Sequence, residues 1–165
     1  MKIVKAKPGS LADVARITRD TISAVYPHYY PPGVVEFFLD WHKDEKILAD
    51  IQAGEVFLLL DEGRAVGTVT LHKNEITRLY VLPQCQGKGY GKALLDFGEE
   101  AVGGAYGKIA VEASLPAKGL YLRRGYRETG FFTEEAAYGD VLCWDVMEKR
   151  WSPGDRPASQ KGDKI

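Results

Sequence analysis

The segment between residues 81 and 92 constrains this chain most. It reads Val-Leu-Pro-Gln-Cys-Gln-Gly-Lys-Gly-Tyr-Gly-Lys, so glycine stands at positions 87, 89 and 91. A β-branched run leads into it and an apolar pattern of helical spacing follows it. Glycines at alternate positions let the backbone approach a ligand closely, and the N–H groups of the loop and of the helix start can converge on an anion. The segment therefore predicts a strand–loop–helix unit that binds a phosphate-bearing ligand.

Two common phosphate-binding loops do not fit this segment. A Walker loop ending at Lys92 needs glycine where Gln86 stands, and serine or threonine where Ala93 stands. A dinucleotide-binding fingerprint needs its third glycine at Lys92 or at Leu94, depending on where it begins. Both motifs are excluded, and a glycine-rich turn without a ligand stays open as the alternative.

Secondary-structure signals along the chain predict one α+β domain over residues 1–149. Helices are expected at 10–26, 34–41, 44–52, 92–102 and 117–123, and strands at 2–7, 56–60, 65–71, 76–81, 108–113, 126–132 and 141–147. Ser10 and Asp13 have the spacing of a capping box at the first helix. This order predicts α/β/α layers, with a mixed, mostly antiparallel sheet of about six to seven strands and helices on both faces. Residues 152–165 lack periodicity and are expected to form a disordered tail.

Charge and composition exclude several classes of function. The 22 basic and 23 acidic side chains give a net charge of −1, which disfavours a nucleic-acid binder. Apolar runs are too short for a membrane span and the N-terminus is unlike a signal peptide, so a cytoplasmic protein without membrane contact is expected. Cys85 and Cys143 form no CxxC motif, and His28, His42 and His72 lack metal-ligand spacing. We therefore expect no disulfide framework and no metal.

The glycine segment is similar to a known cofactor-binding motif. Gln86, Gly89 and Gly91 fit the pattern Q/R-x-x-G-x-G/A, between a strand and a helix in the same order. Residues 117–126, Ala-Lys-Gly-Leu-Tyr-Leu-Arg-Arg-Gly-Tyr, fit the spacing A-x-x-x-Y-x-x-x-G-F/Y. Both segments resemble the GCN5-related N-acetyltransferase (GNAT) superfamily, and the likeness covers residues 1 to about 149. It implies the GNAT-like acyl-CoA N-acyltransferase fold, with acetyl-CoA as the acyl donor and no metal.

The resemblance implies a place for each part of acetyl-CoA. Backbone amides of the glycine loop would bind the pyrophosphate, and the dipole of the following helix would add positive potential. The pantetheine arm would pair like an extra strand where the family's sheet opens, and a backbone N–H there would polarise the thioester carbonyl. The implied cofactor-binding residues are Leu79, Tyr80, Val81, Gln86, Gly87, Lys88, Gly89, Tyr90, Gly91, Lys92, Ser114 and Tyr121. Lys88 is left open between a ribose phosphate contact and solvent, and Ser114 stands where the family often has the longer asparagine.

The resemblance also implies two catalytic residues. Tyr121 matches the tyrosine that protonates the departing CoA thiolate, the alternative being a tyrosine that only packs on the sheet. Glu75 matches the general base of several members, the alternative being a salt bridge at a strand edge. His72, His28 and water are rival bases, because an unperturbed imidazole titrates near neutral pH.

The acceptor side is the least specified. Aromatic residues at 26–32, with Tyr29 and Tyr30, occupy the region that lines the acceptor side in the family, where ring faces attract a cation; a hydrophobic flap is the equal alternative. The implied activity is transfer of acetyl from acetyl-CoA to a primary amine by direct attack in a ternary complex. The acceptor is then a small-molecule or peptide amine, a protein N-terminus or lysine included. A non-catalytic CoA-binding sensor or structural module is the alternative, and residues 141–147 are a candidate strand for pairing across a homodimer.

Overall fold

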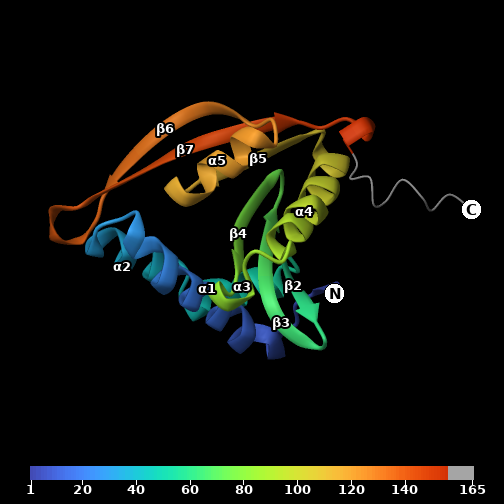
Figure 1. Ribbon diagram of the computed structural model, residues 1–165, viewed down its shortest axis with the longest axis horizontal. Coiled ribbons are helices and arrows are strands. Elements are labelled where there is room, and N and C mark those ends of the chain that lie inside the picture. The colour runs from blue at the N-terminus through green and yellow to red at the C-terminus, as the bar shows by residue number, and fades with distance from the viewer. Residues whose placement is uncertain (156–165) are drawn as a thin grey trace, which may run out of the picture.

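The computed structural model describes residues 1–155 as a seven-stranded mixed sheet with helices on both faces (Figure 1). The elements are β1 (Lys2–Lys5), α1 (Leu11–Val25), α2 (Pro32–Trp41), α3 (Asp44–Gln52), β2 (Val56–Asp61), β3 (Arg64–His72), β4 (Glu75–Val81), α4 (Tyr90–Tyr106), β5 (Lys108–Ala113), α5 (Leu115–Arg123), β6 (Arg127–Glu135) and β7 (Val141–Arg150). The strand order is β1-β2-β3-β4-β5-β7-β6, with β4 and β5 parallel and the other neighbours antiparallel. The predicted fold class is confirmed.

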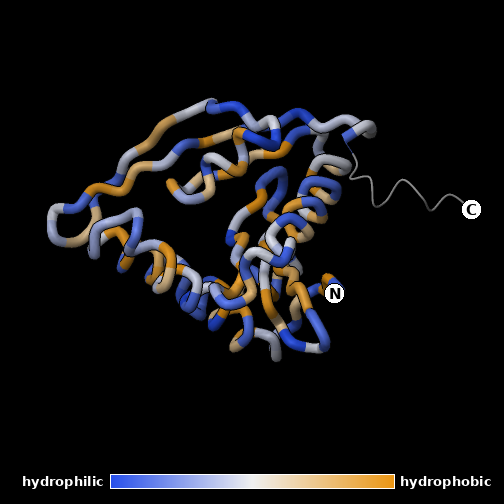
Figure 2. Tube along the Cα trace, in the orientation of Figure 1, coloured by the Kyte–Doolittle hydropathy of each residue, from blue (hydrophilic) through white to orange (hydrophobic). Residues whose placement is uncertain are grey.

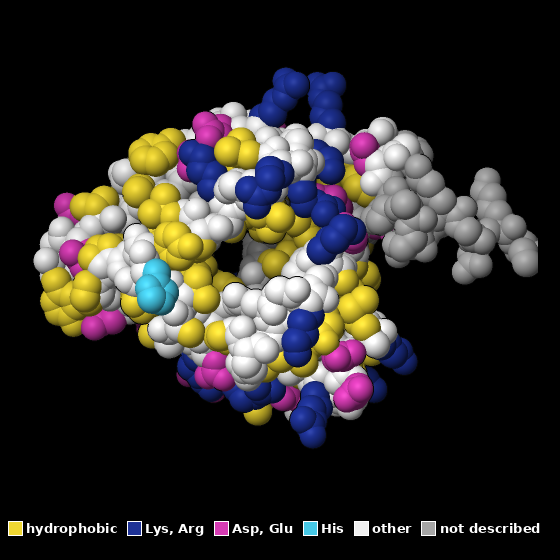
Figure 3. Space-filling view, in the orientation of Figure 1, with side chains coloured by type: hydrophobic (Ala, Val, Ile, Leu, Met, Phe, Trp, Pro, Cys, Tyr) yellow, Lys and Arg dark blue, Asp and Glu magenta, His cyan; other side chains and the backbone are white. Residues whose placement is uncertain are grey.

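The sheet opens between its two halves. β4 and β5 pair at one position, Glu75 with Ala110, and then diverge, as Figure 1 shows. Beyond that pair, the edge of β4 that faces β5 has no strand partner. At the far end the turn between β6 and β7 returns to α2, where the Gly33 N–H donates to Asp140 Oδ2 at 2.8 Å. The opening is thus bounded at both ends, and the space-filling view shows a hollow at the centre of this face (Figure 3).

Each face of the sheet has its own hydrophobic core. The core under α1, α2 and α3 and the core under α4 and α5 contain fully buried aliphatic side chains. Members of the first are Val14, Ile17, Ile22, Val34 and Ile47, and members of the second are Leu94, Leu95, Ile109 and Met147. Apolar and polar residues alternate along these elements in the hydropathy trace, as expected of elements with one buried face (Figure 2). Burying each such side chain contributes about 1.5–3 kcal/mol, so the two cores hold both halves of the sheet in place.

Two local expectations at helix ends are wrong. Ser10 makes no side-chain cap to α1; instead its hydroxyl accepts the Lys7 N–H at 3.3 Å. Helix α4 continues past residue 102 to Tyr106, although glycines at 103 and 104 weaken its helix propensity. The Trp151 ring packs where a side chain at Gly103 would stand, so tertiary packing outweighs the propensity.

The strand that was expected to pair across a dimer has no free edge. β7 is hydrogen-bonded to β5 on one side and to β6 on the other, because the β6–β7 hairpin places the later strand inside the sheet. The interpretation of residues 141–147 as an exposed pairing edge is therefore wrong. Residues 156–165 of the predicted tail lie outside the described residues, and residues 153–155 form a short 3-10 turn. No helix among residues 1–155 is long and apolar enough to cross a membrane.

Candidate functional site

Two cavities meet at the opening between β4 and β5. The first has a volume of about 400 Å³ and runs along the glycine loop and the start of α4. The second, about 410 Å³, lies between α2 and α3 on one side and strands β4 to β7 on the other. Residues from the turn after α1, from β4 and from the start and middle of α5 line both cavities: Tyr26, Leu79, Tyr80, Ser114, Ala117 and Tyr121. Two ligands can therefore meet at these shared residues from opposite sides.

The glycine loop leaves backbone N–H groups facing the first cavity. Gly87 and Gly89 have φ values of 77° and 85°, a left-handed conformation that disfavours other residues, and nothing lies within 4 Å of a side chain built at either. Gly89 begins α4 without a side-chain cap, so the first N–H groups of this helix lack intrahelical partners. The side-chain amide of Gln86 donates to the Val81 carbonyl at 3.0 Å and joins the loop to the end of β4. This arrangement suits an anion bound by backbone amides.

Two side chains at the start of α4 that line the first cavity have their polar atoms paired within the protein. Tyr90 donates to Asp61 Oδ2 at 2.5 Å, and this hydrogen bond raises the pKa of Tyr90 to about 12. Lys92 pairs with Asp96 at 2.6 Å. Lys88 is exposed and lies outside both cavity linings. Around the loop, the first cavity is therefore lined by three glycines together with Gln86, Tyr90 and Lys92.

A β-bulge distorts β4 beside the opening. The pairing with β3 shifts by one residue between Thr77 and Tyr80, and Arg78 takes a left-handed φ of 42°. Such a conformation costs a non-glycine residue about 1–3 kcal/mol, and it persists where the surroundings hold it in place. The buried Arg78 guanidinium donates to Thr70 at 2.9 Å, to Asp50 at 2.8 Å and to His42 Nδ1 at 3.2 Å. These hydrogen bonds fix the bulge.

A buried polar chain continues from the bulge to the shared residues. Burial, and then Arg78, lowers the pKa of His42 to about 3, so this imidazole is neutral. Because its Nδ1 accepts from Arg78, its Nε2 carries the proton and donates to the Tyr80 hydroxyl at 3.3 Å. The Tyr80 and Tyr26 hydroxyls are 3.1 Å apart. The chain fixes both phenols, and it leaves His42 no free nitrogen to act as a base.

Tyr121 lies at the junction of the two cavities. It comes from α5, is 6% exposed, and packs against Tyr126 with ring centroids 5.2 Å apart. Its hydroxyl has no hydrogen-bond partner among residues 1–155. Burial, and then the neighbouring Tyr26, raises the pKa of Tyr121, so the phenol is neutral at neutral pH. A neutral phenol at this place can donate a proton to a developing anion.

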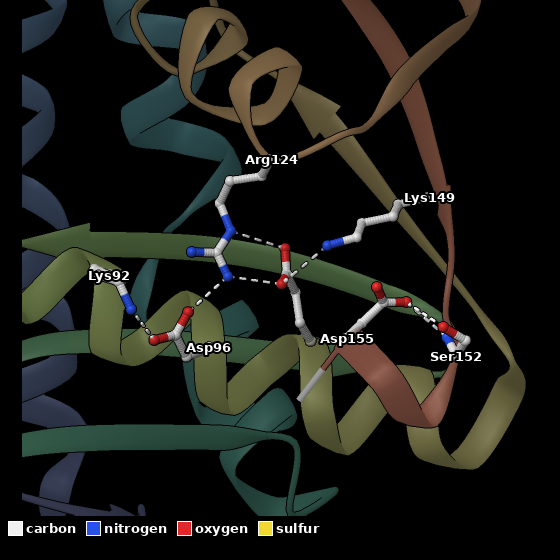
Figure 4. A network of polar contacts seen from close by, with 7 residues as sticks. Lys92, Asp96, Arg124, Lys149, Ser152 and Asp155 are labelled. Atoms are coloured by element: carbon white, nitrogen blue, oxygen red, sulfur yellow. Dashed lines mark hydrogen bonds and ion pairs between the residues drawn. The ribbon is translucent and has the colours of Figure 1, made fainter. Parts of the chain in front are cut away.

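An ion-pair network anchors the helix that carries Tyr121. Arg124, just past the end of α5, donates to Asp96 of α4 at 2.6 Å and to Glu99 of α4 at 2.7 and 3.1 Å, as Figure 4 shows. Lys149 of β7 reaches the same Glu99 at 3.4 Å. The Glu99 side chain is only 3% exposed. The network joins α4, α5 and β7 beside the opening.

The remaining predicted residues are spread over several places. Glu75 lines the second cavity only, and Ser114 lines both. Tyr30 is buried and its hydroxyl accepts the Leu115 N–H at 2.7 Å, whereas Tyr29 is 52% exposed. Neither of these tyrosines lines a cavity.

The two histidines considered as rival bases also differ in position. His72 lines the second cavity but pairs with Glu55 at 2.8 Å, whereas His28 is exposed and lines neither cavity. Sequence reasoning missed the buried residues Arg78, His42 and Asp50, which lack a local motif. Residues 1–155 contain no group of three or more His, Cys, Asp or Glu side chains gathered closely enough to hold a metal ion.

Comparison with known proteins identifies the family. Three similar solved structures share the fold: a GCN5-related N-acetyltransferase from Rhodopseudomonas palustris (24% identity, TM-score 0.83, 91% of this chain and 95% of that one), YncA from Salmonella typhimurium with acetyl-CoA (16%, 0.68, 91% and 93%), and PaiA N-acetyltransferase from Thermoplasma acidophilum with coenzyme A (20%, 0.66, 91% and 98%). The search of curated proteins found no match. The profile of the acetyltransferase (GNAT) domain matches residues 25–144. Since this match spans most of the chain, the protein belongs to the GNAT acetyltransferase family.

Proposed function

We propose that the protein transfers an acetyl group from acetyl-CoA to a primary amine by direct attack in a ternary complex. The observation that carries the proposal is the meeting of two cavities at Tyr121. One cavity is lined by a glycine loop with free backbone amides, and the other is a separate space for an acceptor. Direct transfer needs such a geometry, because the attacking nitrogen and the thioester must be held together in one site.

The first cavity fits coenzyme A. The pyrophosphate would lie on the amides of residues 87–92, where the left-handed conformations at Gly87 and Gly89 leave the approach open; the Gln86 N–H already donates to the Pro83 carbonyl at 3.2 Å. The pantetheine arm would run along the unpaired edge of β4, at Leu79, Tyr80 and Val81. Two similar solved structures contain coenzyme A or acetyl-CoA, which supports this assignment. Acetyl-CoA supplies the thioester whose carbonyl carbon the amine attacks.

In the proposed reaction, one side chain donates a proton and another accepts one. As the amine nitrogen bonds to the carbonyl carbon, the carbon–sulfur bond breaks and its electron pair leaves with sulfur. Tyr121 donates its phenolic proton to that thiolate, and the resulting phenolate takes up the second proton that the nitrogen loses as the amide forms. Glu75 lines only the acceptor cavity, so it takes the ammonium proton through a water molecule. A backbone N–H at residues 79–81 polarises the carbonyl.

A module that binds coenzyme A without catalysis is the second candidate. The glycine loop would bind coenzyme A equally well in such a module and in an enzyme, so the loop does not discriminate between the two functions. The second cavity favours the enzyme, because a sensor for coenzyme A needs no space beyond the thioester. Detection of an acetylated amine distinguishes the enzyme from the binding module. The binding of coenzyme A itself is tested by the thermal stability of the protein.

Acetyl-CoA is expected to raise the thermal stability of the protein, whereas ATP and NAD leave it unchanged. A ligand that binds only the folded state adds about 2.7 kcal/mol at a hundredfold excess over its Kd. Differential scanning fluorimetry measures the shift in Tm. Gly89→Val, which places a side chain in the loop where φ is 85°, is expected to abolish the shift, and Gly9→Val, at an open position far from the loop, is expected to retain it. An unchanged Tm of well-folded protein with both acetyl-CoA and free CoA contradicts the assignment.

A further inference from the structure

We propose that the acceptor is a linear aliphatic diamine, whose second ammonium group is bound by Glu112 while its first is acetylated. The inference rests on the proposed function and names the substrate class of the second cavity. Three observations support it: carboxylates without an ion pair, aromatic side chains in the cavity lining, and the register of the strands that line this cavity.

The charges that line the second cavity do not balance. Asp50 is paired with Lys46 at 2.6 Å and with Arg78 at 2.8 Å, and Glu55 is paired with His72. These pairs use the basic side chains of the lining. The carboxylates left over, Glu75, Glu112 and Glu134, have no ion pair within residues 1–155. The cavity is thus built with an excess of negative charge.

Glu112 is the carboxylate among these whose ionisation is opposed by its surroundings. It projects from β5 and its neighbour on the cavity wall is Glu75 of β4. Burial, and then repulsion by Glu75, raises the pKa of Glu112. Two like charges held together in a cavity repel each other unless a cation lies between or beside them. A bound ammonium group relieves this repulsion.

Aromatic side chains form the remaining walls. Phe37 and Trp41 of α2 stack with centroids 6.1 Å apart, and Trp144 of β7 stacks on Phe132 of β6 at 5.8 Å. Phe37, Trp41 and Trp144 line the cavity. Such rings pack against methylene groups and attract cations at their faces. They suit an alkyl chain with a charged end.

Strand register places two carboxylates on either side of Trp144. Paired residues share a face, and Glu112 pairs with Val146 while Glu134 pairs with Leu142. Both therefore lie on the face of Trp144, but they are four residues apart along β7, so only Glu112 is considered as the site of the second ammonium. Glu112 precedes Ser114, a residue of the cavity junction, by two positions, which is about 7 Å along an extended chain. A short alkyl chain spans this distance between a reacting nitrogen and a second one.

The excess of carboxylates also determines what the cavity rejects. An acceptor that carries its own carboxylate at the far end meets like charges there, and a monoamine leaves the carboxylates unpaired. Cadaverine, pentylamine and δ-aminovalerate have the same five-carbon chain and differ only at that end, so they isolate the contribution of the second charge.

The test compares kcat/KM for these acceptors at saturating acetyl-CoA, followed by release of the CoA thiol. We expect cadaverine to exceed pentylamine at least about tenfold, which is the size of a charge-assisted hydrogen bond, and δ-aminovalerate to be the poorest. Glu112→Gln is expected to lower kcat/KM for cadaverine about tenfold and for pentylamine less than about twofold. Glu135→Gln, on β6 and outside the cavity lining, is the control and leaves all three unchanged.

Equal use of cadaverine and pentylamine overturns the inference and leaves the proposed function intact. An equal loss for both amines in Glu112→Gln also overturns it, because the carboxylate then contributes to both reactions and does not recognise a second ammonium group. If no amine is acetylated, the proposed function fails. Calorimetric titration of cadaverine into the protein loaded with free CoA then decides the inference by itself, and undetectable binding overturns it.

Discussion

Tyr121→Phe is expected to lower kcat about hundredfold while the Kd of acetyl-CoA stays within about twofold. The substitution removes one hydroxyl from a buried ring at the cavity junction and keeps the ring's packing on Tyr126. General acid catalysis by a positioned side chain contributes about 10²–10⁴-fold to rate, and the loss falls on kcat because the proton is needed only as sulfur departs. Steady-state kinetics and calorimetric titration of acetyl-CoA measure the two quantities.

The matched control for this prediction is Tyr126→Phe. Tyr126 is equally buried and touches Tyr121, but it lines neither cavity. Its substitution is expected to leave kcat within about twofold. If Tyr121→Phe keeps full turnover, or if both variants lose turnover equally, Tyr121 is a packing residue and the proton comes from elsewhere.

Arg124→Leu is expected to lower the free energy of unfolding by about 3 kcal/mol. It leaves the buried Glu99 carboxylate with Lys149 alone, at 3.4 Å, and removes the link from α5 to Asp96. Removing one partner of a buried ion pair typically costs 3–5 kcal/mol because the remaining charge stays desolvated, and Lys149 offsets part of this. Urea unfolding followed by circular dichroism measures the change.

The control substitution is Arg19→Leu, which breaks an exposed pair with Asp44 at 2.8 Å. Exposed pairs contribute about 0–1 kcal/mol, so this variant should unfold almost as the parent does. A loss in Arg124→Leu no larger than in Arg19→Leu would show that the network does not stabilise the fold.

The cost of Arg124→Leu should also depend on pH. Burial opposes the ionisation of Asp96, but hydrogen bonds from Lys92 and Arg124 outweigh it and hold the pKa of Asp96 below its usual range. A carboxyl whose pKa is lowered by folding stabilises the protein above its unfolded pKa of about 3.9, and this contribution is lost as the pH falls through the folded pKa. The Asp96 part of the difference between parent and variant should therefore be complete at pH 7 and shrink below about pH 4.

Local sequence patterns predicted the parts of the site that are local in the chain. The glycine loop is a run of consecutive residues whose backbone conformation depends on glycine itself, so its strand–loop–helix context could be recognised without a structure. Tyr121 was found through its place in a ten-residue segment, residues 117–126, that resembles a GNAT family motif. The end of α4 was missed, because the packing of Trp151 against Gly103 joins two distant segments.

The buried polar chain could not be predicted from the sequence. Arg78 meets Asp50 and His42, which are 28 and 36 positions away in the chain, and none of the three belongs to a motif. Tyr30 illustrates the reverse case. Its loop was expected on the acceptor side, but its hydroxyl accepts the N–H group of Leu115 in the first turn of α5, so the side chain turns into the protein. Pairing of buried polar groups follows from the tertiary fold, which the local pattern does not contain.

The central claim is most directly tested by mass spectrometry of an amine incubated with the protein and acetyl-CoA that carries a deuterated acetyl group. The account predicts an amine product with the labelled acetyl group, formed in proportion to the protein and about a hundredfold more slowly with Tyr121→Phe. It also predicts no labelled acetyl group on the protein itself, since transfer is direct. Binding of acetyl-CoA without product from any amine would contradict the account and identify a module that binds coenzyme A without catalysis.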